Sequence, residues 1–257
     1  MLSRLASSFT VAAACTRAGS AALRATAPGG RHRWERTNVQ GRGVGLYAGP
    51  ATALAAAAAA GRVRPAAAGR VRPAAGWAVL AAGACGAWDD VAGAGDPRRG
   101  FRAHLKALRH GEVTSGTVKL VGISAAGLLA GAALKRRWPD RILAGVVIAG
   151  AAHAVNLLDV RPGRAVGAVL ALAAPGMLRG GPGAELSAAA TGVAAAVLPD
   201  DLGQRTMLGD TGAHALGAAL GTAVVHANGR SGLLAHAAAV VAAAVCGERL
   251  TARPRGH

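Results

Sequence analysis

Long apolar runs separated by short polar segments are the dominant pattern along this chain. The runs 120–134, 142–158 and 233–245 contain no Asp, Glu, Lys or Arg. A soluble amphipathic helix would instead place a polar residue at every third or fourth position. Uncharged apolar runs are typical of helices that cross a membrane. The pattern therefore predicts an all-α fold, a polytopic transmembrane helix bundle.

Polar breaks divide the chain into a series of such runs. The connectors between them contain Gly, Pro, Arg and Asp, as loops between helices do. Counting the runs predicts about 8–9 spans. The predicted spans cover residues 5–22, 46–60, 76–88, 120–134, 142–158, 165–178, 185–199, 211–227 and 232–247.

The two ends of the chain differ in character from the rest. Residues 1–28 contain Ser, Ala and Arg but no acidic residue, and Arg17 lies in the middle of the run. This composition is that of a targeting-like segment as much as of a first span, so both interpretations stay open. We expect residues 29–250 to form one transmembrane domain and residues 251–257 to form a basic tail.

The acidic residues fall mainly on one side of the predicted membrane. If the connector 23–45 is cytoplasmic, alternation of the spans places every Asp and Glu except Asp140 and Glu185 on the cytoplasmic side. Lys and Arg are also more numerous on that side, as the positive-inside rule requires. We therefore predict a multi-pass protein of the cell membrane with its polar site at the cytoplasmic face.

Composition leaves one alternative fold open and argues against one class of partner. Hydrophobic residues make up 52% of the chain but aromatic residues only 3%, so a soluble Ala-rich helical protein is the alternative. The net charge of +17 comes almost entirely from Arg scattered through short loops. Nucleic-acid binding usually pairs such charge with aromatic residues that stack on bases. We therefore expect a membrane partner and no nucleic acid, with the basic loops near anionic lipid headgroups.

Acidic residues collect where apolar runs begin or end. Asp89 and Asp90 end one run, and Asp210 begins another directly after Gly209. Carboxylates are expensive near hydrocarbon, which makes a polar functional site the default interpretation. Adjacent carboxylates at a helix end can serve different partners, one a divalent cation and the other a proton or hydrogen bond. The alternative for Asp89 and Asp90 is a pair of solvated acids at the start of a loop. The alternative for Asp210 is a helix N-cap, and the free N–H groups of that helix N-terminus would also suit a phosphate.

A further polar cluster, the second of the three in chain order, ends the run 142–158. His153, Asn156 and Asp159 follow one another at a spacing of three residues, which places them on one face of a helix. An imidazole, an amide and a carboxylate could therefore converge there. The alternative is a hydrogen-bond network that only holds the helices together.

Basic residues follow the Asp89-Asp90 pair in the connector 89–119. Arg102 and Lys119 are among them. Cations beside a carboxylate cluster fit a site for a polyanion that is bridged by a metal ion, such as a diphosphate. The alternative is a loop that binds lipid headgroups.

The order of the three clusters resembles that of the polyprenyl-phosphate N-acetylhexosamine-1-phosphate transferases. This family includes the phospho-N-acetylmuramoyl-pentapeptide transferases and the UDP-N-acetylglucosamine:undecaprenyl-phosphate transferases. Asp89-Asp90 is similar to the family's Asp-Asp pair at a cytoplasmic helix end. His153–Asp159 resembles its Asn-x-x-Asn-hydrophobic-x-Asp segment, and Gly209–Ala213 resembles its Gly-Asp-x-Gly-Ser helix start.

The resemblance implies a reaction and a set of roles. A sugar 1-phosphate would pass from a UDP-sugar to a polyprenyl phosphate such as undecaprenyl phosphate, with release of UMP, in cell-envelope glycan synthesis such as that of peptidoglycan. Mg²⁺ or Mn²⁺ would be bound by Asp210 with Asp90, and Asp89 would bind or deprotonate the lipid phosphate. A homodimer is a further expectation. The residues expected to bind the substrates are His153, Asn156, Asp159, Arg102 and Lys119.

Two departures from the family pattern keep other functions open. His153 stands where the family has Asn, and Pro162 stands where a further Asp would follow Asp159. One alternative is a catalytically degenerate relative that acts as a membrane scaffold or partner subunit. A second is an ion-coupled transporter, which would need acidic residues near the middle of its spans rather than at their ends.

Overall fold

The computed structural model is almost entirely helical, which confirms the helical class of the predicted fold. It describes residues 1–38, 40–62, 74–93, 96, 98 and 100–251. A short 3-10 helix at Arg31–Arg33 and an antiparallel pair of strands, β1 (Glu35–Thr37) and β2 (Gly43–Gly45), accompany the α-helices. The helices are α1 (Leu2–Thr26), α2 (Ala48–Arg62), α3 (Ala74–Ala92), α4 (Phe101–Arg109), α5 (Ser115–Leu134), α6 (Trp138–Leu158), α7 (Arg164–Met177), α8 (Gly181–Leu202), α9 (Gly209–Ala227) and α10 (Arg230–Thr251).

The helices begin at local signals and continue beyond the apolar runs. Alanine, the strongest helix former, dominates most of them. The Thr114 side chain caps α5 by accepting a hydrogen bond from the Thr117 N–H at 3.1 Å. Because of this cap, α5 starts at Ser115 and includes Lys119, which the apolar pattern had assigned to the preceding connector. The predicted boundary was wrong here because a helix extends through polar residues that an apolar count leaves out.

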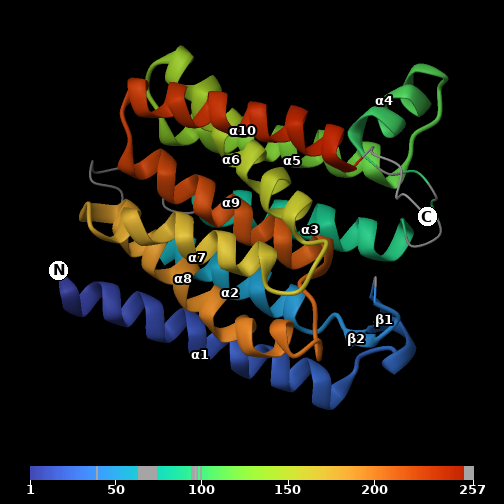
Figure 1. Ribbon diagram of the computed structural model, residues 1–257. Helices are drawn as coiled ribbons and strands as arrows, with labels where there is room; N and C mark the ends of the chain where they lie inside the picture. The colour runs from blue at the N-terminus through green and yellow to red at the C-terminus, as the bar shows by residue number, and fades with distance from the viewer. Residues whose placement is uncertain (39, 63–73, 94–95, 97, 99, 252–257) are drawn as a thin grey trace.

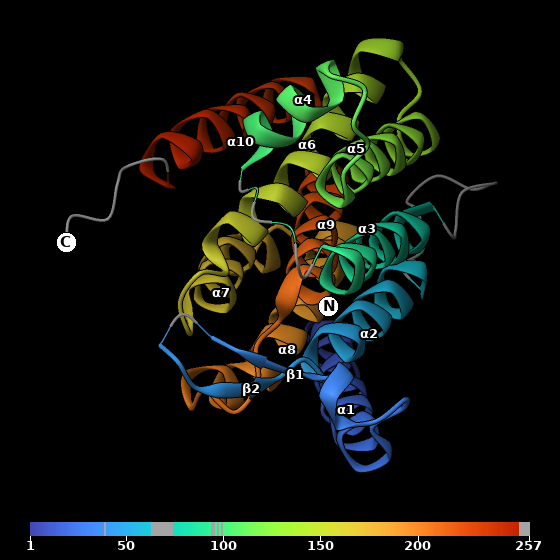
Figure 2. The same cartoon turned by 90° about the vertical axis from the view of Figure 1, so that its right-hand side faces the viewer.

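Helix α9 forms the centre of the bundle. It contacts α2, α3, α6, α7 and α8, and in Figure 2 these helices surround it when the bundle is seen from the end that bears α4 and the strands. Almost every α9 residue from Gly209 to Val225 is buried. Helix α1 packs against α8 and α2 at the edge of the bundle (Figure 1).

Small residues allow α9 and its neighbours to approach closely. A Cβ added at Gly217 would collide with the backbone of Ala151 on α6, and one at Gly221 would lie 2.8 Å from the Ile148 Cα. Close contact through glycine and alanine is typical of helix pairs in membranes. The Ala- and Gly-rich composition therefore serves tight helix packing.

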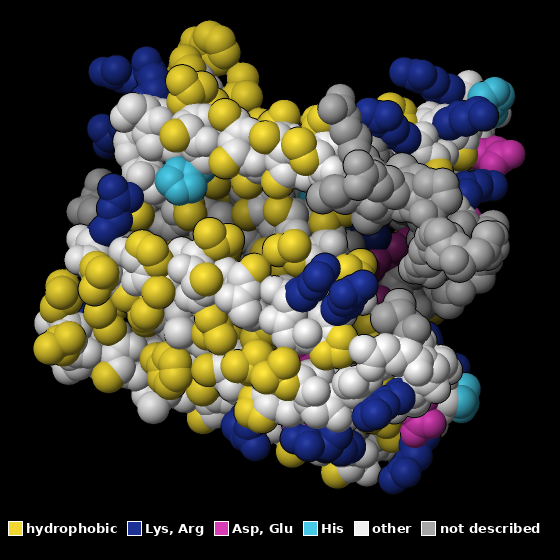
Figure 3. All heavy atoms as spheres, in the orientation of Figure 1, with side chains coloured by type: hydrophobic (Ala, Val, Ile, Leu, Met, Phe, Trp, Pro, Cys, Tyr) yellow, Lys and Arg dark blue, Asp and Glu magenta, His cyan; other side chains and the backbone are white. Residues whose placement is uncertain are grey.

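Three helices are long and apolar enough to cross a membrane. Within the described residues these are Ser115–Leu134, Trp138–Leu158 and Arg230–Gly247. Large apolar side chains on the outside of the bundle fit this character: Leu129 and Leu234, for example, are 73% and 59% exposed. Figure 3 shows hydrophobic side chains over much of the face formed by α10 and α7. Three is fewer than the 8–9 spans predicted, so the larger number stays a prediction.

Two elements lie in segments that the apolar pattern had assigned to connectors. Helix α4 lies within the predicted connector 89–119, and the β1–β2 hairpin lies within the predicted connector 23–45. Both lie at the same end of the bundle (Figures 1 and 2). Apart from residue 251, the predicted basic tail lies outside the described residues.

Candidate active site at one end of the helix bundle

A lysine joins two aspartates from different helices at the end of the bundle where α3 ends and α9 begins. The Lys119 Nζ donates hydrogen bonds to Asp89 Oδ2 and Asp210 Oδ2, both at 2.5 Å. The three side chains are only 16%, 16% and 26% exposed, in the order Lys119, Asp89, Asp210. The structure therefore brings the first and third acidic clusters of the sequence together around one ammonium group.

Asp90, next to Asp89 in the chain, caps α9. Its Oδ1 accepts the Asp210 N–H at 3.0 Å, and its Oδ2 accepts the Thr211 N–H at 2.9 Å and the Thr211 hydroxyl at 2.6 Å. A carboxylate at a helix N-terminus satisfies backbone N–H groups that have no partner within the helix and also compensates the helix dipole. Both oxygens of Asp90 are thus engaged, and metal ligation by Asp90 stays a prediction.

This cap removes two alternatives for the start of α9. The N-cap position is Leu208 rather than Asp210, so Asp210 does not cap its own helix. The N–H groups of Asp210 and Thr211 are bound by Asp90, and a backbone hydrogen bond joins Gly209 to Asp159. The first turn of α9 is occupied by the protein's own carboxylates and offers these N–H groups to no phosphate.

Glycines set the distance between α3 and α9. A Cβ at Gly86 would collide with the Asp210 carbonyl, so a larger residue there would force the helices apart. Gly209 has a φ of +59° and lies against Asp90, where an added Cβ would be 3.2 Å from each carboxylate oxygen. Positive φ is readily adopted by glycine. Gly86 and Gly209 therefore permit the approach that places Asp90 on α9.

Asp159, from the second cluster, lies just beyond the end of α6 and next to the start of α9. Burial raises the pKa of its carboxyl to about 8, and the nearby negative charges of Asp201, Asp210 and Asp90 act in the same direction. The Gly209 backbone hydrogen bond opposes this shift. Asp159 is therefore a carboxyl whose charge is disfavoured first by burial and then by the other acids of the site.

The apolar pattern missed Asp201 as a residue of this region. It is 4% exposed, and its Oδ2 accepts the Gly163 N–H at 2.7 Å in the turn between α6 and α7. The sequence places it at the end of an apolar run, as it does Asp89, and that position was the available signal. Asp201 fixes the turn that follows Asp159.

His153 meets a histidine that the sequence analysis had not singled out. The rings of His153 and His214 lie edge to face with their centroids 5.4 Å apart. The Nε2 atom of each is buried without a hydrogen-bond partner, whereas His214 Nδ1 hydrogen-bonds the Asp210 carbonyl oxygen at 2.7 Å. His153 thus lies beside the helix that bears Asp210.

Two other predicted substrate-binding residues have different positions. Asn156 lies in the last turn of α6, where its backbone carbonyl oxygen accepts a hydrogen bond from the Asp159 N–H at 3.1 Å. Arg102 lies on α4, where it is exposed. The structure therefore places Asn156 near Asp159 and Arg102 on the surface helix that precedes α5.

The β1–β2 hairpin borders the site. Gly45, in β2, pairs with the segment before α9: its N–H donates to the Arg205 carbonyl at 3.2 Å, and its carbonyl accepts the Met207 N–H at 3.0 Å. On β1, the Arg36 guanidinium donates to the Asp90 carbonyl oxygen at 3.3 Å. The hairpin therefore anchors the strand-like approach to α9 and adds a cation near Asp90.

The donor chemistry of Asp89 and Asp210 fits a hard divalent cation. In the part of the chain that the structure describes, no group of three or more His, Cys, Asp or Glu side chains is arranged to hold a metal ion. Mg²⁺ at phosphate-transfer sites is, however, often held by one or two carboxylates together with substrate phosphates. Asp89 and Asp210 converge on one cation, the Lys119 ammonium. A metal ion at this site would therefore be held by one or both of these carboxylates.

No protein-family model matches the sequence, and no curated protein matches it. The assignment of a function therefore depends on the residues and their geometry.

Proposed function

We propose that this protein is a membrane transferase that moves a sugar 1-phosphate from a UDP-sugar to a polyprenyl phosphate, with release of UMP. The reacting end of the bundle would face the cytoplasm, and the 8–9 predicted spans would form the membrane domain. The single observation that carries the proposal is the convergence of Asp89 and Asp210 on Lys119 at one end of apolar helices.

Charge explains why such a cluster suits this reaction. Both substrates carry phosphate groups, which repel each other and must be brought together at the membrane surface. In the transfer, an oxygen of the lipid phosphate bonds to the phosphorus that bears the sugar, and the bond from that phosphorus to the UMP phosphate oxygen breaks. Electrostatic stabilisation and positioning contribute most of the rate enhancement in phosphoryl transfer.

Each residue of the cluster receives a role from its contacts. The Lys119 ammonium would move from the carboxylates to a phosphate oxygen, since it is the cation already at their meeting point. Asp89 would hold or deprotonate the lipid phosphate. Asp90 would position Asp210 through its hydrogen bonds to the first turn of α9.

A divalent ion completes the proposed site. Asp210 would hold Mg²⁺ or Mn²⁺, which neutralises diphosphate charge when bound, and Asp89 beside it would remain the group that deprotonates the lipid phosphate. Asn156, Asp159 and His153 would line the nucleotide side, because they lie at the adjoining end of α6.

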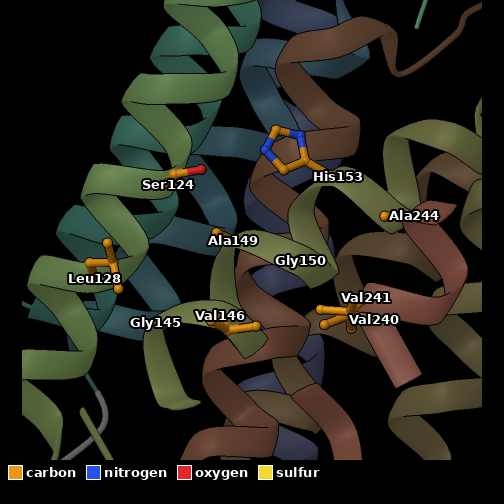
Figure 4. Close-up of a pocket in the computed structure, with 10 residues that line it drawn as sticks. All are labelled: Ser124, Leu128, Gly145, Val146, Ala149, Gly150, His153, Val240, Val241 and Ala244. Carbon is orange, nitrogen blue, oxygen red and sulfur yellow. The ribbon is translucent and has the colours of Figure 1, made fainter. Parts of the chain in front are cut away.

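An apolar cavity between helices would receive part of the lipid chain. A cavity of about 230 Å³ lies between α5, α6 and α10, with His153 at one end (Figure 4). His153 is two helical turns nearer than Val146 to the end of α6, so the cavity leads from the site toward the middle of the bundle. The residues whose side chains line it include Ser124, Leu128, Ala149, His153, Val240 and Val241.

The test is UMP release by the purified full chain in lipid nanodiscs, with UDP-N-acetylglucosamine, undecaprenyl phosphate and Mg²⁺. Asp210→Asn and Asp89→Asn should each lower the rate by at least about 100-fold if these carboxylates stabilise the transition state. Asp140→Asn is the matched control, because Asp140 is also ion-paired, to Arg230, and lies outside the proposed site. Wild-type activity that survives both site substitutions would refute the site.

A structural role is the second candidate, and one observation favours it. Lys119 already pairs with both Asp89 and Asp210, so the cluster would hold α3, α5 and α9 together without a substrate. A protein that releases no UMP with any UDP-sugar, and that unfolds more easily when Lys119 is replaced, would be a membrane scaffold or partner subunit.

A further inference from the structure

Helix α4 has adjacent apolar and basic stripes. Residues three or four positions apart share a face of a helix, and the apolar stripe follows this spacing with Phe101, Leu105 and Leu108. No Asp or Glu lies between positions 101 and 110. The basic stripe repeats the same spacing one position later, with Arg102, Lys106 and Arg109.

Both stripes are accessible, because α4 is held to the bundle by a third side. Phe101, Leu105 and Leu108 are 36%, 38% and 39% exposed, and Lys106 and Arg109 are exposed. The less exposed side bears His104, whose Nδ1 lies 2.9 Å from the hydroxyl oxygen of Thr114, the cap of α5. Helix α4 is therefore fixed in place while its apolar stripe stays partly exposed and Lys106 and Arg109 of the basic stripe stay exposed.

The position of α4 matches a membrane boundary. The helix ends at Arg109, and the candidate span α5 begins at Ser115. An ion pair between Arg98 and Glu112, at 2.8 Å, joins the segments before and after α4. Figures 1 and 2 both place α4 at the outer edge of the end where α5 begins. A helix held there lies at the level of lipid headgroups if α5 crosses the membrane.

We propose that α4 is an interfacial helix that binds anionic phospholipids on the membrane surface at the site end. The apolar stripe enters the boundary between headgroups and acyl chains, and the basic stripe binds the phosphate-bearing headgroups. Short amphipathic helices with basic polar faces bind membranes in this way, and each Lys or Arg near an anionic surface adds to the attraction. This surface is separate from the transfer reaction and does not depend on it.

The experiment measures the membrane depth of one position on α4 in the full chain. Cys15, Cys85 and Cys246 are replaced by Ala, and a spin label is attached after Leu105→Cys. The protein is placed in nanodiscs of phosphatidylcholine alone or with one quarter phosphatidylglycerol. Collisions of the label with oxygen report the acyl region, and collisions with a water-soluble nickel chelate report water.

The label should be shielded from the nickel chelate in the anionic discs and less so in the neutral discs. The double variant Lys106→Glu and Arg109→Glu should lower the ratio of oxygen collisions to nickel-chelate collisions by roughly tenfold or more, because each basic residue contributes to the attraction to anionic lipid. The pair Arg136→Glu and Arg137→Glu is the matched control, since it makes the same charge change in the α5–α6 connector, at the other end of α5. This control should leave the depth at position 105 unchanged.

A second measurement needs no charge variant. Added salt should move the label toward water in the anionic discs, because screening weakens attraction between exposed charges. A label equally open to the nickel chelate in both lipids would overturn the proposal and point to a soluble acidic partner. A depth that survives charge reversal would also overturn it, because the basic stripe would then have no part in binding.

Discussion

The two ends of the helix bundle hold their charged residues in opposite ways. At the site end, Lys119 bridges Asp89 and Asp210 with side chains no more than 26% exposed. At the other end, Arg230 pairs with Asp140 at 2.6 Å, but the arginine is 50% exposed. Both ends join helices by ion pairs at short distance. At the other end Asp140 is also shielded, at 18% exposed, but only at the site end do both partners of each pair lose most of their contact with water.

Burial changes what such a pair contributes. An exposed ion pair typically adds 0–1 kcal/mol, since water already solvates both groups. A buried pair adds little net stability but is costly to break, because one charge is left without a partner. The site end also gathers Asp90, Asp159 and Asp201 near the same helix start. Costly acidic groups at a membrane boundary are typical of function rather than of helix packing.

Replacing Lys119 should produce the largest difference between the two ends. Lys119→Met leaves Asp89 and Asp210 facing each other without a cation and should lower the free energy of unfolding by about 3–5 kcal/mol. Arg230→Met, the matched change at the other end, should leave the free energy of unfolding almost unchanged, because water already solvates the exposed arginine. Denaturant unfolding of both variants in detergent micelles measures the difference. Equal losses would mean that the two ends do not differ in burial as described.

The close approach of α3 to α9 provides the next contrast. Gly86→Ala places a methyl group against the Asp210 carbonyl and should destabilise the protein by about 1–3 kcal/mol through overpacking.

Gly61→Ala is the control, because a Cβ there, in the last turn of α2, meets no atom of the described residues within 4 Å. It should be neutral or stabilising by up to about 1 kcal/mol, as expected when alanine replaces a helical glycine. Thermal unfolding of the two variants distinguishes them. A Gly86→Ala protein as stable as the parent would contradict the close contact.

The pH dependence of stability provides the smallest effect. The pKa of Asp159 rises from 3.8 in the unfolded chain to about 8 in the folded protein. Between pH 3.8 and pH 8 the folded state therefore binds more protons than the unfolded chain. The contribution of Asp159 to stability is accordingly present below pH 4 and is lost as pH rises through 8.

Asp159→Asn should remove this dependence. The loss of unfolding free energy between pH 5 and pH 9 should be smaller in the variant than in the parent by about 1–2 kcal/mol, because the carboxyl keeps partial contact with solvent. Unfolding measured at both pH values gives the comparison. An identical pH dependence in the two proteins would show that Asp159 titrates normally.

Local patterns predicted most helices but not their exact ends. The run 165–178 and α7 (Arg164–Met177) nearly coincide, because both ends are set by nearby polar residues. Helix α5 starts five residues before the run 120–134, since Thr114 supplies a cap that hydropathy does not register. Helix α4 was missed because its alternating apolar and basic residues fill too short a segment to form an apolar run.

The candidate site was predicted as separate clusters rather than as contacts. Asp89 and Asp210 were placed on one face by counting spans, and the structure brings both to Lys119. The partners of Asp90 could not be predicted, because they are the backbone N–H groups of Asp210 and Thr211, which lie 120 and 121 positions further along the chain. The meeting of His153 with His214 likewise depends on how α6 packs against α9.

The sequence by itself determined the helical class, the apolar character and the placement of acidic residues at the ends of apolar runs. These properties follow from neighbouring residues, because helix propensity and hydrophobicity act over a few turns. Only the tertiary structure decided which groups neutralise those acids: Lys119 for Asp89 and Asp210, and the first turn of α9 for Asp90. Ion pairs and caps between distant segments act over a few ångströms, so they exist only after the glycines have allowed the helices to come into contact.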